Sequence, residues 1–271
     1  MIGVELKKML RRPRTWITIA LLDALPTLVA ILLAVTDLGP RPGSGPAFLS
    51  AVLTDGTLYP LAALAIVLPL FMPVAVAVVA GDSIAGEAQA GTLRYILARP
   101  VGRTRLLVAK LVSVVAFVLV AVVIVAVTGY VVGALLLGDG DPSGLATGVS
   151  GTALTSAQIA ERTLLSVGYV TLSMLGVAAL ALLLSTATDS SLGAALGALA
   201  FLIASTLLLT LDAAASLQPY LPTRYWLAFV DLFRDPILWR DVVRGILLQG
   251  VYLAVFLGAA WANFTTKDIT S

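Results

Sequence analysis

The chain has 271 residues, of which 59% are hydrophobic and 12% are charged, and its mean hydropathy is +1.02. An ordinary soluble domain has about 25% charged residues, so this composition excludes that class and predicts an integral membrane protein. The chain contains no cysteine and no histidine, which excludes disulfides, thiolate metal sites and the commonest general base at neutral pH. We therefore expect neither a catalytic residue nor a metal site.

The first 14 residues predict a short amphipathic helix. Its apolar residues at helical spacing are Ile2, Leu6, Met9 and Leu10, and its basic residues on the other faces are Lys7, Lys8, Arg11 and Arg12. The pattern fits a helix on the membrane surface with its basic side toward anionic headgroups, and it fits equally a positively charged anchor for the first span. Because Asp23 and Pro26 interrupt the apolar run that follows, we expect no cleavable signal peptide.

Six apolar runs are long enough to cross a bilayer, which requires about 20 residues each. We place the spans, within a single transmembrane domain of residues 1–271, at residues 15–35, 58–80, 106–137, 164–186, 192–211 and 245–264. The third run is too long for a simple crossing, so its start, with Lys110, is expected to extend beyond the membrane as a helix. The fourth and fifth spans form a helical hairpin, with Asp189 or Ser190 available as a helix cap.

The distribution of lysine and arginine predicts the orientation. Eleven of the 17 basic residues fall on one side, in residues 7–14, residues 94–110 and the C-terminal tail. Under the positive-inside rule, both termini lie in the cytoplasm. We expect a multi-pass protein of the inner (plasma) membrane of a prokaryote.

The outer segments differ in character. Residues 37–57 and 138–153 are rich in Gly, Pro, Ser and Thr and predict irregular loops. Residues 212–244 are rich in aromatic residues, which favour the level of the lipid headgroups. We expect one or two short helices on the outer leaflet there, with an ordinary aromatic-rich loop as the alternative. The fold class is thus all-α and polytopic.

The charged loop between the second and third spans, residues 81–110, carries the most specific pattern. Gly91 and Thr92 predict a helix break followed by a cap. Leu93, Ile96 and Leu97 then share one apolar face. The residues that point away from this face or end the short helix are Arg94, Arg99 and Pro100. A helix of about six residues cannot bury such a face on itself, so it needs the bilayer surface or a partner protein. Thr104 is expected to cap the third span.

This loop resembles the first cytoplasmic loop of type-2 ATP-binding-cassette (ABC) exporter permeases. The matching residues are Glu87-x-x-x-Gly91-Thr92-Leu93, Leu97-Ala98-Arg99-Pro100-Val101-x-Arg103 and Ala109-Lys110. The tail at residues 264–269 is similar to the C-terminal signature of the six-span subunits grouped with sodium/drug-export and nitrous-oxide-reductase accessory permeases. With six spans and an amphipathic N-terminal helix, the resemblance covers essentially the whole chain.

The resemblance implies that residues 92–98 form a coupling helix that docks into a separate ATPase subunit, with Glu87 just before it. It also implies an exporter that contains two ATPases and either two copies of this chain or one copy and a related permease. None of the four lysines follows a glycine, so the chain has no phosphate-binding loop. We therefore expect no enzymatic activity in this chain, ATP and Mg bound by the partner, lipids around the spans, and no nucleic-acid partner.

The sequence fits two other classes of membrane protein less well. An ion-coupled secondary transporter usually needs acidic residues inside the membrane, and Asp23 is the one candidate, unless it lies at the interface. An intramembrane hydrolase with a Ser-His or Cys-His site is excluded by composition. Gly193 and Gly197 form a G-x-x-x-G pair, which fits packing within the subunit or dimerisation. The sequence does not indicate the substrate.

Overall fold

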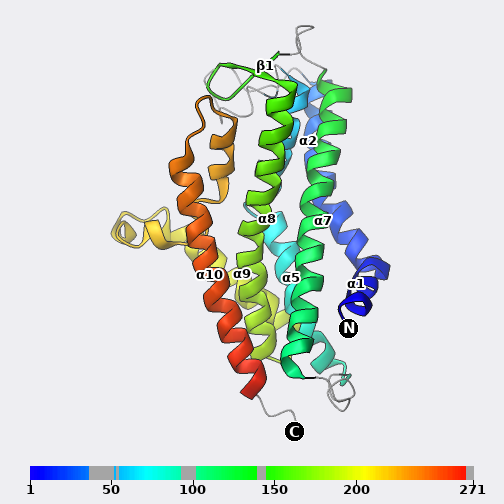
Figure 1. Ribbon diagram of the computed structural model, residues 1–271. Helices are drawn as coiled ribbons and strands as arrows, with labels where there is room; N and C mark the ends of the chain where they lie inside the picture. Colours follow the sequence, from blue (N-terminus) through cyan, green and yellow to red (C-terminus); the bar gives the residue numbers. More distant parts are fainter. Residues whose placement is uncertain (37–51, 53–54, 93–101, 139–144, 267–271) are drawn as a thin grey trace.

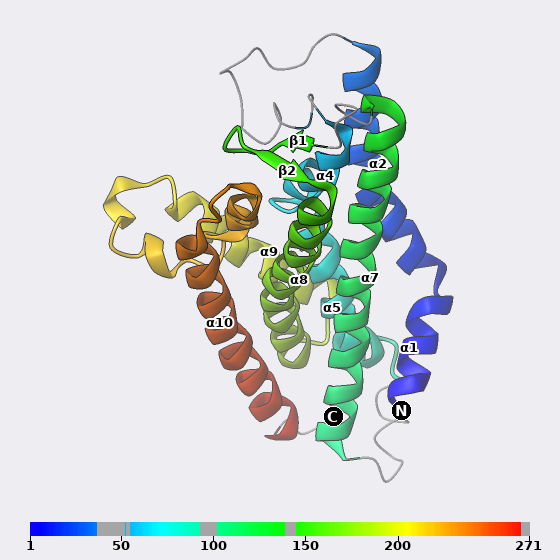
Figure 2. The ribbon, with the colours of Figure 1, turned by 45° about the horizontal axis from the view of Figure 1, so that its top comes forward.

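The computed structural model describes residues 1–36, 52, 55–92, 102–138 and 145–266. Long helices run side by side along the molecule, and the first residue and the end of the last helix lie toward the same end, here called the basal end (Figure 1). The opposite end, called the distal end, carries a two-stranded antiparallel sheet, β1 (Leu145–Thr147) and β2 (Ala153–Thr155), which pairs Ala146 with Leu154 (Figure 2). Apart from this sheet, the regular elements in the described ranges are helical, which confirms the all-α prediction.

Six helices within the described residues are long and apolar enough to cross a membrane. They are α2 (Pro13–Val35), α5 (Phe71–Gln89), α7 (Arg103–Leu137), α8 (Ser156–Ala187), α9 (Ser191–Leu208) and α10 (Trp239–Thr266). The architecture is therefore that of a multi-pass membrane protein. The third span begins as a helix before Lys110, as predicted, because α7 starts at Arg103.

The second span differs from the prediction of one helix over residues 58–80. A 3-10 turn, η1 (Gly56–Leu58), leads into α4 (Tyr59–Val67), and α5 starts only at Phe71. Pro69 explains the break, since proline has no amide hydrogen to continue the helix and clashes with the preceding helical turn. Leu68 keeps helical dihedral angles, and the chain leaves the helical region at Leu70, with φ −134° and ψ −57°. Nearly every residue of α4 is buried, so this short helix lies inside the bundle, packed against α2 and α7.

The charged loop is shorter than predicted. Residues 81–89 continue α5 as a helix, so the connection to α7 comprises residues 90–102. Gly81 permits this continuation beside α9, because a Cβ there would meet the backbone nitrogen of Ala195 at 3.0 Å. Asp82 and Glu87 are accepted on this helix because each has basic partners from other helices.

The α8–α9 hairpin forms as predicted. Ser190 is the N-cap of α9, and its hydroxyl accepts a hydrogen bond from the Gly193 amide at 3.0 Å. A Cβ at Gly197 would lie 3.1 Å from the side chain of Leu184 on α8. The residue that closes this turn is thus Ser190. Gly193 and Gly197 are both exposed, Gly193 beside its own helix cap and Gly197 beside Leu184.

A second pair of glycines, which was not predicted from the sequence, makes a close helix contact. Gly129 and Gly133 lie four residues apart on α7 and face α4 and η1. A Cβ at Gly133 would come within 2.2 Å of the Gly56 carbonyl oxygen, and one at Gly129 within 3.0 Å of the Ala63 side chain. Small residues at this spacing let two backbones approach closely.

The segment between α9 and α10 is more elaborate than predicted. It contains three 3-10 helices within residues 212–233, namely η2 (Asp212–Ala214), η3 (Gln218–Tyr220) and η4 (Trp226–Phe233). The chain leaves the end of α9 sideways and returns along α10 through η4, as both ribbon views show (Figures 1 and 2). Phe229 and Phe233 of η4 are buried in the main core, so η4 belongs to the bundle and is not a surface helix.

We expect Gly133→Ala to destabilise the protein by about 1–3 kcal/mol, because the added methyl group meets fixed backbone. Gly168→Ala on α8 is the matched control, since nothing lies within 4 Å of its Cβ position. This control should be neutral or stabilising by up to about 1 kcal/mol, the difference in helix propensity. Thermal unfolding in detergent compares the two, and equal midpoints would contradict the close α7–η1 contact.

Candidate functional site

The residues predicted for coupling fall into two groups. Glu87, Gly91 and Thr92 lie within the part of the chain that the structure describes. The remaining ones lie outside it, namely Leu93, Arg94, Ile96, Leu97, Arg99 and Pro100. The site is therefore built from the ends of α5 and α7, on either side of this loop.

Glu87 lies at the centre of a buried ion network at the basal end. Its Oε1 accepts hydrogen bonds from Lys110 of α7 and, at 2.7 Å, from Lys8 of α1 (Ile2–Arg11). Lys110 Nζ also contacts Glu5 Oε2 of α1 at 2.9 Å. The Glu87 and Lys110 side chains are only 8% and 4% exposed. Because an unpaired buried charge costs several kcal/mol, each of these groups depends on its partners.

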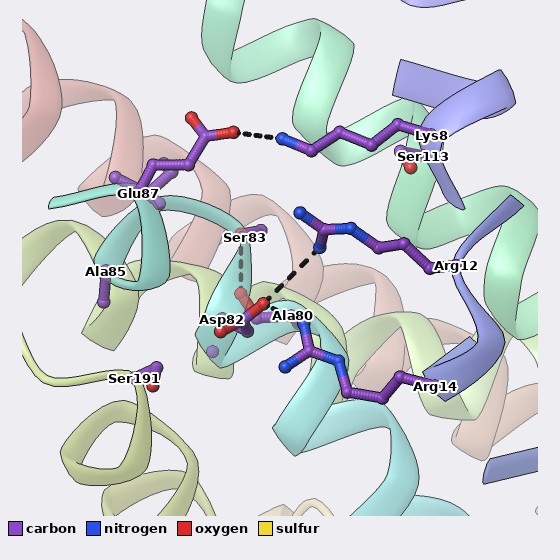
Figure 3. A network of polar contacts seen from close by, with 12 residues as sticks. Lys8, Arg12, Arg14, Ala80, Asp82, Ser83, Ala85, Glu87, Ser113 and Ser191 are labelled. Carbon is purple, nitrogen blue, oxygen red and sulfur yellow. Dashed lines mark hydrogen bonds and ion pairs between the residues drawn. The ribbon is translucent and has the colours of Figure 1, made fainter. Parts of the chain in front are cut away.

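Asp82, five residues earlier on α5, organises a second and more exposed pair of contacts. Its Oδ2 accepts a hydrogen bond from Arg14 and lies 3.6 Å from Arg12 Nη1. Both arginines come from the junction between α1 and α2, and they point toward Asp82 beside the Lys8–Glu87 contact (Figure 3). The lower part of α5 is thus tied to the N-terminal region at two successive levels.

These contacts correct the prediction for the N-terminal helix. Lys8 turns inward to Glu87, so it does not lie on a basic side that faces headgroups. Met9 is buried and Leu6 packs against the main core, whereas Ile2 and Leu10 are exposed. The helix is therefore docked on α7, with part of its apolar surface left free.

A cavity of about 410 Å³ lies between the N-terminal region, α5 and α7. It is lined by both ion clusters together with Thr92 and Ser113. Glu87 Oε2 is buried and has no hydrogen-bond partner among the described residues. In those same ranges, no group of three or more acidic side chains could hold a metal ion. The arrangement links helices electrostatically and presents no nucleophile paired with a base.

The loop leaves α5 through a tight turn that involves Glu87 again. Gly91 has φ +69°, the left-handed conformation that commonly ends helices and favours glycine. The Thr92 amide and hydroxyl both donate to the Glu87 carbonyl oxygen, at 3.0 and 3.1 Å. The predicted helix break is confirmed, and the backbone of Glu87 holds the first residue of the predicted coupling helix.

The other side of the loop is tied to the end of α10. Arg103 Nη1 donates to the Phe264 and Thr265 carbonyl oxygens, at 3.4 and 2.9 Å. Basic side chains commonly satisfy the last carbonyl groups of a helix in this way. Thr104 does not cap α7 as predicted; it accepts a hydrogen bond from Trp261 Nε1 at 3.0 Å, and the N-cap position is Gly102.

Glu87 is predicted from the sequence as a site residue, but its partners are not. Lys8 and Lys110 counted only toward the positive-inside rule, because charge placement along the chain does not indicate pairing in space. One signal was available: Asp82 and Glu87 are the acidic residues of α5, and the chain has clustered basic residues near its start. The distances, however, depend on how α1 folds back.

Asp23 forms a separate polar position. It is the eleventh of the 23 residues of α2, so it lies in the middle of this helix and not at its end. Its Oδ1 is buried without a partner among the described residues, while Thr128 of α7 is within hydrogen-bonding reach of the carboxyl group. The nearby Tyr59 hydroxyl donates to the Pro26 carbonyl oxygen.

We expect Glu87→Gln to lower the free energy of unfolding by about 3–5 kcal/mol, since it leaves buried Lys110 without its central counter-charge. Asp231→Asn is the matched control, because Asp231 pairs with Arg234 at 2.8 Å in a more exposed setting. Its cost should be about 0–1 kcal/mol. Denaturant unfolding in mixed micelles measures both, and similar costs would show that the basal network does not hold the helices together.

Comparison with known sequences places the chain in a family. A family model described as "Protein of unknown function (DUF2705)" matches residues 31–270. The matched region contains Glu87 and Lys110, while Glu5 and Lys8 lie before it. No curated protein matches the chain. Because the match covers most of the 271 residues, the protein belongs to the DUF2705 family.

Proposed function

We propose that this chain is the transmembrane subunit of an ATP-driven exporter and that it couples to a separate ATPase through residues 92–98. Six apolar helices agree with this role, as does the resemblance of the charged loop and the C-terminal tail to type-2 ABC exporter permeases. The observation that carries the proposal is the buried ion network of Glu87, at the end of α5 where the loop begins. An exporter subunit needs such a connection between a docking helix and its spans.

The network connects the proposed docking helix to the membrane-spanning helices. When the ATPases close on ATP, a displacement of residues 92–98 pulls on Thr92 and therefore on the Glu87 backbone. The Glu87 side chain passes this displacement to α1 and α7. On the other side, Arg103 passes it to the end of α10. The spans then rearrange around a path through the membrane, with ATP and Mg held by the two ATPase partners.

The proposal includes a dimer and an orientation. A second copy of this chain, or a related permease, completes the transport path, and both termini lie in the cytoplasm. The first residue and the end of α10 lie toward the same basal end, which supports placing both on one side of the membrane (Figure 1). The basic residues of α1 and of the start of α7 lie at that same end, in agreement with the positive-inside rule.

An ion-coupled secondary transporter is the second candidate, and the position of Asp23 in the middle of α2 favours it. Acidic residues inside spans commonly mark ion or proton pathways. No second carboxyl group accompanies Asp23 among its described contacts. Such a transporter needs no ATPase, so loss of an associated ATPase separates the two candidates.

We expect Leu97→Asp to reduce ATPase association at least tenfold, because a charge in an apolar contact costs several kcal/mol unless it finds a partner. Arg94→Glu is the control, since an exposed charge contributes only about 0–1 kcal/mol. The tagged protein is purified from its native membrane, and co-purified ATP hydrolysis is measured for the wild type and both variants. Unchanged association and transport in Leu97→Asp would rule out this helix as the docking element.

We expect single cysteines to report the orientation without background, since the chain has no native cysteine. Arg240→Cys, exposed at the start of α10, should react with a membrane-impermeant maleimide in intact cells. Arg99→Cys should react only after permeabilisation. The reverse pattern would invert the topology and remove the cytoplasmic loop on which the exporter proposal depends.

A further inference from the structure

A groove of about 530 Å³ lies on the outside of the bundle, far along the chain from the ion network. One wall is the segment at residues 219–225, which runs from η3 to the start of η4 and is here called the irregular segment. It contributes Tyr220 and Arg224. The other wall is one face of α10, with Arg244 followed by Leu247, Leu248 and Val251. The groove therefore has two guanidinium groups and an apolar wall.

The irregular wall is fixed by hydrogen bonds from the neighbouring helices. The Tyr252 hydroxyl donates to the Tyr220 carbonyl oxygen at 2.7 Å, and buried Gln249 donates to that of Pro222 at 2.7 Å. On the other side of Arg224, the Tyr169 hydroxyl of α8 donates to the Tyr225 carbonyl oxygen at 2.6 Å. These bonds hold the backbone on both sides of Arg224, so its position beside α10 is built into the fold.

The charges of the groove are only partly neutralised by the protein. Arg224 is exposed and has no ion pair within the described residues. Arg244 lies 3.9 Å from Asp241, and both side chains of that pair are about half exposed, so this contact is loose. No carboxylate lines the groove. Two guanidinium groups in one groove favour an anion with several oxygen atoms, such as a phosphate group.

The apolar wall indicates what the anion is attached to. Arg244 precedes the apolar part of α10, and Leu247 and Val251 are 65% and 60% exposed. With a helical rise of 1.5 Å per residue, Val251 lies about 10 Å deeper along α10 than Arg244. A molecule that matches both features has a negatively charged head and an apolar chain at least that long.

We propose that this groove binds one anionic phospholipid from the membrane leaflet on the distal side. Its phosphate contacts Arg224 and Arg244, and an acyl chain lies along Leu247 and Val251. The bound lipid joins the irregular segment to α10 from the outside, where the two arginines would otherwise repel each other. The site stands whether or not the chain associates with an ATPase.

The test uses the full chain, purified in detergent and stripped of lipid. Phosphatidylglycerol, phosphatidylcholine or inorganic phosphate is then added. Native mass spectrometry counts the bound lipid molecules, and thermal unfolding measures the stabilisation of the protein. The wild type should bind phosphatidylglycerol in preference and unfold at a higher temperature with it. The double variant Arg224→Gln/Arg244→Gln should bind it about tenfold more weakly or worse, because charge-assisted hydrogen bonds are lost.

Arg240→Gln is the control for Arg244→Gln, since it removes one positive charge from α10 outside the groove, and it should bind lipid like the wild type. If the double variant does not fold, Arg224→Gln alone gives the answer, because exposed Arg224 has no described ion pair to lose. Equal binding of phosphatidylcholine would contradict the preference for an anionic headgroup. Equal stabilisation by inorganic phosphate would contradict a role for the acyl chain. An equal loss of lipid binding in Arg240→Gln would show that the effect comes from surface charge and not from the groove.

Discussion

The buried ion pair between Glu87 and Lys110 is the contact on which the basal end of this protein depends. Neither charge can be removed from water alone, so α5 and α7 must bring them together at the same depth. Lys8 and Glu5 complete the charge balance, and this draws α1 onto the bundle. The position of the N-terminal helix is thus set by electrostatics as much as by its apolar residues.

The two described ends of the charged loop are held to the bundle. The carboxylate of Glu87 contacts two other helices, while its carbonyl group holds Thr92. Arg103 ties the far side of the loop to α10. A displacement of this loop would therefore act on α1, α5, α7 and α10 together, as the proposed coupling role requires.

The distal half is held by different forces. Gly129 and Gly133 let α7 approach the broken second span closely, with contacts that a single methyl group would disrupt. The irregular segment before η4 exposes carbonyl groups that lipid cannot satisfy. Tyr169 and Gln249 donate hydrogen bonds to this backbone. Side chains of regular helices thus allow a non-helical segment to remain among the spans.

Length and apolarity predicted the six spans, because any helix that crosses a bilayer must contain about 20 apolar residues. Ser190 and Gly91 were also predictable, since caps and helix breaks depend on neighbours in the chain. The division of the second span was not predicted, although Pro69 gave a local signal for it. Likewise, Gly129 and Gly133 have the spacing of a packing motif, but the spacing alone does not say which backbone approaches.

By itself, the sequence determined the membrane class, the number of spans, the absence of a phosphate-binding loop and the place of the charged loop, since each depends on composition or local order. The tertiary structure decided the pairing of Glu87 with Lys8 and Lys110 and the groove between Arg224 and Arg244. The physical reason is the same in each case. These residues are far apart in the chain, and their energies depend on distance and burial, which exist only once the helices have packed.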